Sequence, residues 1–126
     1  MEIIFVGLGG AIGACSRFLI TKISTNYLPI FPLGTLISNI IAGFFIGFII
    51  GIERQALFIN PKVKVFLTSG LLGGLSTFST FSMDTVSMFE SGKYALAIGN
   101  ILLNVGLSFI CVFLGLMVAK IFVKAN

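Results

Sequence analysis

Charged residues are scarce in this sequence. Only 10% of its 126 residues are charged, whereas a soluble domain carries roughly 25%. Hydrophobic residues make up 57% of the chain, so a folded surface would have too little charge to be well hydrated. The sequence therefore predicts an all-α integral membrane protein with a single transmembrane domain over residues 1–126.

Histidine is absent, which excludes histidine proton relays, histidine metal sites and Ser-His-Asp triads. The two cysteines, Cys15 and Cys111, stand alone in apolar stretches without a CxxC motif, so buried structural thiols are expected. The eight basic residues are scattered along the chain, and their pattern does not predict nucleic-acid binding. Without paired carboxylates or a soluble domain, the chain is not expected to be an enzyme.

Four apolar stretches are long enough to cross a bilayer, because a membrane helix needs about 20 apolar residues. They run over about residues 3–21, 33–52, 65–89 and 94–119. The first lacks the basic start of a signal peptide and three further spans follow it, so we expect it to be retained. The sequence thus predicts four transmembrane helices.

Basic residues are distributed only slightly unequally between the two sides of such a four-span protein. The side shared by both termini and the second connection carries Arg54, Lys62, Lys64, Lys120 and Lys124. The other side carries Lys22 and Lys93, together with Arg17 where its side chain extends outward. This small excess favours internal termini but leaves insertion in both orientations open.

Glycines recur at helical spacing on the first two spans. One face of the second span carries Gly43, Gly47 and Gly51, and the first span carries Gly9 and Gly13 in register with Arg17. Small residues at this spacing let helix backbones approach closely in lipid. The pattern predicts a compact bundle that also oligomerises.

Asparagines lie on the same kind of face. Asn39 precedes Gly43 by one turn, and Asn100, Asn104 and Ser108 form a line on the fourth span. An amide in hydrocarbon is costly unless it is hydrogen-bonded, so these side chains must face another helix or a hydrated cavity. For Asn100 and Asn104, interhelical bonding and pore lining remain equally open. Arg17, near the end of its span, is predicted to anchor the helix or to pair within the bundle.

Residues 70–82, GLLGGLSTFSTFS, are poorly suited to a membrane helix. Three glycines are followed by five hydroxyl residues, and both kinds of residue weaken a helix. Irregular backbone at membrane depth persists only where protein or a cavity surrounds it. The third helix is therefore predicted to break near Gly73 to Ser76, with freed carbonyls that suit a small cation such as sodium.

Phe78 and Phe81 follow this break and share one helix face. The edge of an aromatic ring is electropositive, so two ring edges can favour a small anion without a formal charge. On this spacing alone, ordinary packing is the favoured explanation.

Three motifs in this order resemble the Fluc (CrcB-type) fluoride channel family over nearly the whole chain. They are Gly9-Gly10-x-x-Gly13-Ala14-x-x-Arg17, Gly34-Thr35-Leu36-x-x-Asn39-x-x-x-Gly43 and Gly73-Gly74-x-Ser76-Thr77-Phe78-Ser79-Thr80-Phe81-Ser82. The first motif alone is weak, but all three on a four-span chain are highly specific.

The resemblance implies a fluoride-selective passive channel that exports cytoplasmic fluoride across a prokaryotic inner membrane and so lowers its toxicity. It also implies an antiparallel, dual-topology homodimer with two pores. A structural sodium ion at the dimer centre would be held by backbone carbonyls, which by position belong to Gly73 and Ser76. The family usually has Thr where Ser76 stands, a change to which a carbonyl ligand is insensitive.

The same resemblance implies roles for individual side chains. Asn39, Phe78 and Phe81 match the pore asparagine and the paired phenylalanines whose ring edges contact fluoride. Hydroxyls of a polar track correspond to Ser79, Thr80 and Ser108. Arg17 matches a vestibule-side arginine, and Asp84 stands where the family commonly has Glu, so no detailed role is assigned to it.

Other functions remain as alternatives. A fluoride–proton antiporter would use Asp84, the only acid well inside a predicted span, to carry the proton. A small dual-topology multidrug transporter has a similar architecture, but it needs a carboxylate in the first span, where only Glu2 occurs at the very start. A helper subunit of a larger complex is favoured by nothing except the short length.

Overall fold

The computed structural model describes residues 1–55 and 57–125, which form helices and short connections without any strand. The elements are α1 (Glu2–Thr25), α2 (Leu33–Arg54), α3 (Pro61–Val65), the π-helix η1 (Phe66–Leu72), α4 (Gly73–Leu75), α5 (Phe78–Glu90) and α6 (Tyr94–Ala125). Among the described residues, α1, α2 and α6 are each long and apolar enough to cross a membrane. The chain is therefore an all-helical, multi-pass membrane protein.

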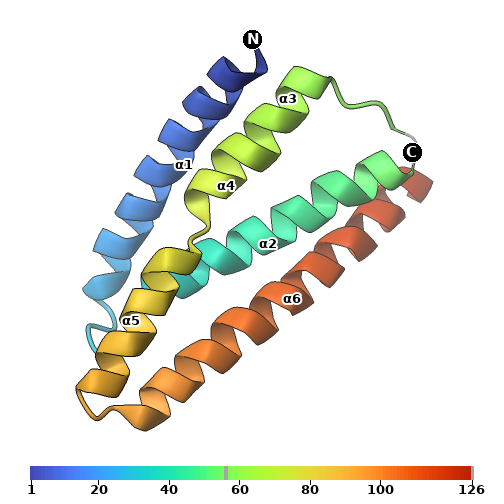
Figure 1. Ribbon diagram of the computed structural model, residues 1–126. Coiled ribbons are helices and arrows are strands. Elements are labelled where there is room, and N and C mark those ends of the chain that lie inside the picture. The colour runs from blue at the N-terminus through green and yellow to red at the C-terminus, as the bar shows by residue number, and fades with distance from the viewer. Residues whose placement is uncertain (56, 126) are drawn as a thin grey trace.

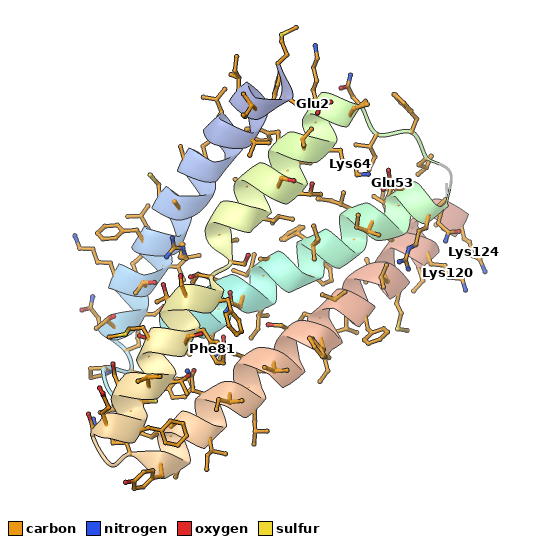
Figure 2. The ribbon with its side chains drawn as sticks, viewed as in Figure 1. Glu2, Glu53, Lys64, Phe81, Lys120 and Lys124 are labelled. Atoms are coloured by element: carbon orange, nitrogen blue, oxygen red, sulfur yellow. The ribbon has the colours of Figure 1, made fainter. Side chains whose placement is uncertain are left out.

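The helices form two side-by-side pairs (Figure 1). Helix α1 lies along the continuous run of α3, η1 and α4, while α2 lies along α6, and these two contacts are the most extensive in the fold. Both termini and the α2–α3 connection lie toward one side of the molecule, and the α1–α2 and α5–α6 connections lie toward the other. Labelled charged side chains gather toward the first side (Figure 2), where Lys64 Nζ contacts Glu53 Oε1 at 2.6 Å.

The predicted third span is divided by two extended residues. Ser76 has φ −74° and ψ 153°, and Thr77 has φ −154° and ψ 119°. Thr77 is also the N-cap of α5, because its Oγ1 accepts a hydrogen bond from the Thr80 N–H at 3.2 Å. The break therefore lies at the C-terminal end of the predicted segment, and Gly73 itself keeps helical backbone angles.

Glycines bring the paired helices into backbone contact, which confirms the close packing predicted from their spacing. A Cβ at Gly47 would clash with the Val112 carbonyl oxygen of α6, and one at Gly115 would clash with the Phe44 carbonyl oxygen of α2. Across the other pair, Gly13 meets the backbone of Leu71 in the same way. These glycines are used within one chain, where they set the separation between helices.

The prediction that both cysteines are buried was wrong. Cys15 is exposed on α1 and Cys111 is half-buried on α6. An apolar stretch of a membrane helix need not be covered by protein, because lipid solvates its outer face.

Replacing Gly115 with Ala tests the close approach of α2 and α6. The new methyl group would lie 2.7 Å from the Phe48 backbone nitrogen, and overpacking of this kind costs about 1–3 kcal/mol. We expect a lower melting temperature of the purified protein in detergent. Gly106→Ala is the matched control on the same helix, because nothing lies within 4 Å of the added Cβ. Equal melting temperatures for the two variants would contradict this description of the interface.

Candidate functional site

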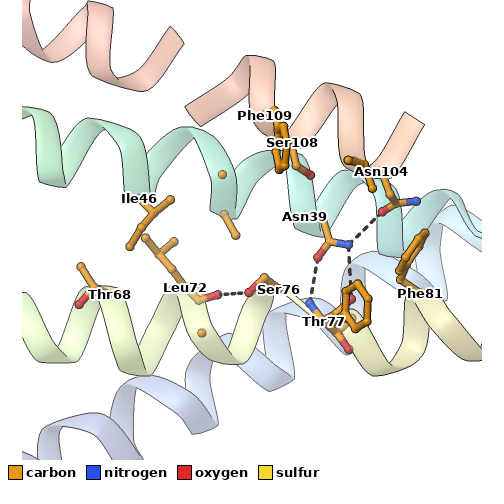
Figure 3. Close-up of a pocket in the computed structure, with 15 residues that line it drawn as sticks. Asn39, Ile46, Thr68, Leu72, Ser76, Thr77, Phe81, Asn104, Ser108 and Phe109 are labelled. Carbon is orange, nitrogen blue, oxygen red and sulfur yellow. Dashed lines mark hydrogen bonds between the residues drawn. The ribbon is translucent and has the colours of Figure 1, made fainter. Parts of the chain in front are cut away.

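A cleft of about 510 Å³ opens between α2, α6 and the break in the third helix. Six of the residues to which the family resemblance assigns a pore or ion-binding role line it: Asn39, Gly73, Ser76, Phe78, Phe81 and Ser108. Its walls come from α2, η1, α4, α5 and α6, so the cleft exists only when all these elements are assembled. Figure 3 shows the labelled side chains of these elements around it.

Asn39 connects α2 to the break. Its Oδ1 accepts a hydrogen bond from the Thr77 N–H at 2.9 Å, a group that would donate to Gly73 in an unbroken helix. Its Nδ2 donates to Asn104 Oδ1 at 2.9 Å and makes a longer contact of 3.4 Å with the Thr77 carbonyl oxygen. These bonds are drawn in Figure 3. The amide thus replaces the helical partner of Thr77 and holds the two sides of the cleft together.

The hydrogen bonding continues beyond Asn39 into the protein. Asn104 Nδ2 donates to Asn100 Oδ1 at 2.8 Å and to the Asn100 carbonyl oxygen at 3.1 Å. Asn100 Nδ2 then donates to Thr85 Oγ1 at 2.9 Å. Asn100 is fully buried at 0% exposure, which favours interhelical bonding for this residue, whereas Asn104 both bonds to Asn39 and lines the cleft.

The two phenylalanines differ strongly in exposure. Phe81 is 8% exposed and Phe78 is 78% exposed in the single chain. Their ring centroids are 5.4 Å apart and the ring planes are inclined by 54°. Both rings line the cleft together with Asn39.

The backbone at the break meets the requirements of a small hard cation only in part. The Gly73 carbonyl loses its usual helical donor to Asn39, and Ser76 is extended, so its carbonyl departs from the helix direction. Sodium prefers oxygen ligands, and such carbonyls fit that preference. Within the described residues, no cluster of three His, Cys, Asp or Glu residues could hold a metal. Two carbonyls alone are too few for a complete shell of ligands.

The three hydroxyls of the predicted polar track do not line one common hollow. Ser108 lines the cleft, but Ser79 is exposed and lies outside its lining. Thr80 lines a second hollow of about 320 Å³. This second hollow also contains Thr35 and Asp84, where Thr35 Oγ1 donates to Asp84 Oδ2 at 3.1 Å. One cleft therefore does not contain all the hydroxyls that the sequence suggested.

Arg17 lies outside the cleft and reaches the break from α1. Its Nε donates to the Gly74 carbonyl oxygen at 3.2 Å. In a continuous helix that carbonyl would accept from the N–H of residue 78, so the guanidinium compensates for a donor lost at the break. The side chain is half-buried and pairs two elements of the bundle.

Two residues that take part in the hydrogen bonds at and behind the cleft, Thr77 and Thr85, were given no individual role from the sequence. Thr77 joins Asn39 to the start of α5, and its signal was its place as a hydroxyl residue at the beginning of a helix. The sequence indicated Thr85 only weakly: it lies one helical turn beyond Phe81 and so shares a helix face with it. Its Oγ1 donates to the Phe81 carbonyl oxygen at 2.7 Å.

Comparisons with known proteins agree on one family. The family model described as CrcB-like protein, Camphor Resistance (CrcB), matches residues 4–116. A relative from Clostridium perfringens is 45% identical over 119 residues, covering 94% of this chain and 93% of the relative. A relative from Pyrococcus horikoshii is 42% identical over 113 residues, covering 90% and 91%. Both relatives bear the name "Fluoride-specific ion channel FluC".

Replacing Arg17 with Leu tests its role at the helix break. The Gly74 carbonyl would lose its donor in a part-buried position, and an unsatisfied group of this kind costs about 1–3 kcal/mol. We expect a lower melting temperature than for Lys22→Leu, which removes an exposed cation from the same helix. A melting temperature for Arg17→Leu equal to that of the wild type would contradict the proposed compensation.

Proposed function

The chain belongs to the CrcB-like protein family, and on this premise we propose that it is a fluoride-specific channel through which fluoride leaves the cell passively. The observation that carries the proposal is the cleft, which brings Asn39, Phe78, Phe81 and Ser108 together beside a broken helix. The relatives named as fluoride channels support the choice of ion. A channel performs no bond-making step, so no catalytic residue is assigned.

Uncharged donors are suited to conducting fluoride. Fluoride is small and strongly hydrated, so a pore must replace its water with several other favourable contacts. The amide of Asn39, the hydroxyl of Ser108 and the ring edges of Phe78 and Phe81 are contacts of this kind. None of the described residues lining the cleft is charged, so no fixed cation would trap the anion.

The membrane potential supplies the driving force. Hydrogen fluoride crosses bilayers and dissociates at neutral pH, so fluoride accumulates in the cytoplasm. A negative interior then expels the anion, with about 2.3 kcal/mol per charge for each 100 mV. This role places the chain in a prokaryotic inner membrane. It needs no proton carrier, in contrast to the antiport alternative based on Asp84.

The membrane assembly belongs to the same proposal. The run from α3 to α5 forms a fourth, broken crossing, which agrees with both termini lying toward one side of the chain (Figure 1). Two chains in opposite orientations form the homodimer, consistent with the weak charge bias. The carbonyls of Gly73 and Ser76 from both copies would hold a structural sodium ion in this dimer.

Reconstitution in liposomes tests the ion and the cleft. Purified wild-type protein should release trapped fluoride rapidly, with a potassium ionophore to dissipate the voltage, and should release negligible chloride. Phe81→Ile and Phe78→Ile remove the ring edges and should lower fluoride release by about tenfold or more, corresponding to about 1.4 kcal/mol in the barrier. Asn39→Asp should also block, because it removes a donor and adds an anionic group.

A fluoride electrode measures the release, and size-exclusion chromatography verifies that each variant assembles as the wild type does. Wild-type rates in both phenylalanine variants would refute the ring-edge mechanism. Chloride release as fast as fluoride release would refute selectivity.

The dimer and its sodium ion have separate tests. The mass of the detergent-solubilised protein, corrected for bound detergent, should correspond to two chains. With Lys124→Cys in a cysteine-free background, a membrane-impermeant thiol reagent should label about half of the molecules from each side of the membrane, because the charge bias is small. Purification with N-methylglucamine in place of sodium should reduce fluoride release, and returning sodium should restore it. A monomeric mass or labelling from one side alone would contradict the assembly, and unchanged release without sodium would contradict the ion.

A further inference from the structure

Five hydrogen bonds form one continuous series that begins at Thr77, the N-cap of α5, and ends at Phe81 within α5. In order from donor to acceptor, they join the Thr77 N–H to Asn39 Oδ1 (2.9 Å), Asn39 Nδ2 to Asn104 Oδ1 (2.9 Å), Asn104 Nδ2 to Asn100 Oδ1 (2.8 Å), Asn100 Nδ2 to Thr85 Oγ1 (2.9 Å) and Thr85 Oγ1 to the Phe81 carbonyl oxygen (2.7 Å). All the bonds point the same way. The series of hydrogen bonds therefore has a direction, from the helix break to the backbone of Phe81.

The two ends dictate that direction. The Thr77 N–H can only donate and the Phe81 carbonyl can only accept, because both are backbone groups. Each amide between them must therefore present its oxygen to the preceding donor and its nitrogen to the following acceptor. Reversing Asn39 or Asn104 alone would oppose two oxygens on one side and two N–H groups on the other.

Burial makes such a reversal unfavourable. Asn100 is 0% exposed, Asn104 is 4% exposed and Thr85 is 6% exposed. Little water can reach these groups to satisfy a mismatched donor or acceptor, so the orientation is strongly maintained. The same bonds connect α2, α5 and α6, which together form most of the cleft wall.

We propose that Thr85, Asn100 and Asn104 are positioning residues that hold the Asn39 amide with its N–H groups directed as an anion donor. This inference rests on the proposed fluoride conduction and extends it to side chains that need not contact the ion. One Asn39 Nδ2 proton is committed to Asn104 at 2.9 Å, and the other makes only the 3.4 Å contact with the Thr77 carbonyl oxygen. This second, weakly held proton is the one that turns to fluoride.

A substitution at Thr85 gives the most specific test, because Thr85 is the side chain farthest from Asn39 in the series of hydrogen bonds. Thr85→Val keeps the shape of the side chain and removes the hydroxyl, so the buried Asn100 Nδ2 loses its acceptor. Asn100 and Asn104 can then rotate, so Asn104 Oδ1 no longer holds the Asn39 Nδ2 proton in place, although the Thr77 N–H still bonds to Asn39 Oδ1. We expect fluoride release from liposomes to fall by about tenfold or more, while the protein still assembles as the wild type does.

Two matched variants separate positioning from general disruption. Thr85→Ser keeps the hydroxyl and should release fluoride within about twofold of the wild type, a change well below 1 kcal/mol. Ser82→Ala removes another α5 hydroxyl that bonds to the carbonyl four residues earlier. Ser82 takes no part in the series of five hydrogen bonds. This variant should also retain wild-type release. Wild-type release by assembled Thr85→Val would overturn the inference, as would an equal loss in Thr85→Ser or Ser82→Ala.

A second measurement, nuclear magnetic resonance, uses the wild-type protein and needs variants only to assign the resonances. Nuclear magnetic resonance of wild-type protein labelled with ¹⁵N at asparagine should show two distinct Nδ2 protons for Asn39. Adding sodium fluoride should shift one of them and leave the proton bound to Asn104 nearly unchanged, while sodium chloride should shift neither. Equal shifts of both protons, or no shift in protein that conducts fluoride, would overturn the inference. Absence of fluoride release from the wild type would instead refute the proposed function.

Discussion

The fold depends on satisfying backbone polar groups where little water is available. The break at Ser76 and Thr77 interrupts the helical hydrogen bonds, and other parts of the chain supply the missing partners. Asn39 accepts from the Thr77 N–H, and Arg17 donates to the Gly74 carbonyl oxygen. The broken helix is therefore stable only within the assembled bundle, because its partners come from α1 and α2.

Close helix contacts make these partnerships possible. Gly47 and Gly115 allow the backbones of α2 and α6 to touch, and Gly13 allows the same between α1 and η1. An asparagine side chain is short, so Asn39 and Asn104 could not meet across helices separated by larger residues. The glycines and the polar network are thus two parts of one arrangement, with the glycines setting the separation that the amides span.

The described residues line the resulting cleft with polar groups, none of which carries a formal charge. Its polar groups are amides, hydroxyls and backbone groups, and its apolar wall includes two aromatic rings. Such a surface offers many modest contacts to a small anion, whereas a lysine or arginine in the same place would bind it too firmly for rapid release. The directed hydrogen bonds fix the orientation of the Asn39 amide at this surface. An amide free to rotate would present its oxygen as often as its N–H groups.

Composition and spacing alone determined that the chain is a helical membrane protein, because apolar length and glycine periodicity depend on local sequence. The run of glycine and hydroxyl residues also predicted a break, but not that Gly73 would remain helical and that Ser76 and Thr77 would become extended. Tertiary structure decided which polar residues meet. It placed Thr80 in a second hollow and brought Thr85 into contact with Asn100. Those contacts depend on how the helices cross, which no local pattern specifies, since hydrogen-bond partners far apart in the chain become neighbours only after the bundle packs.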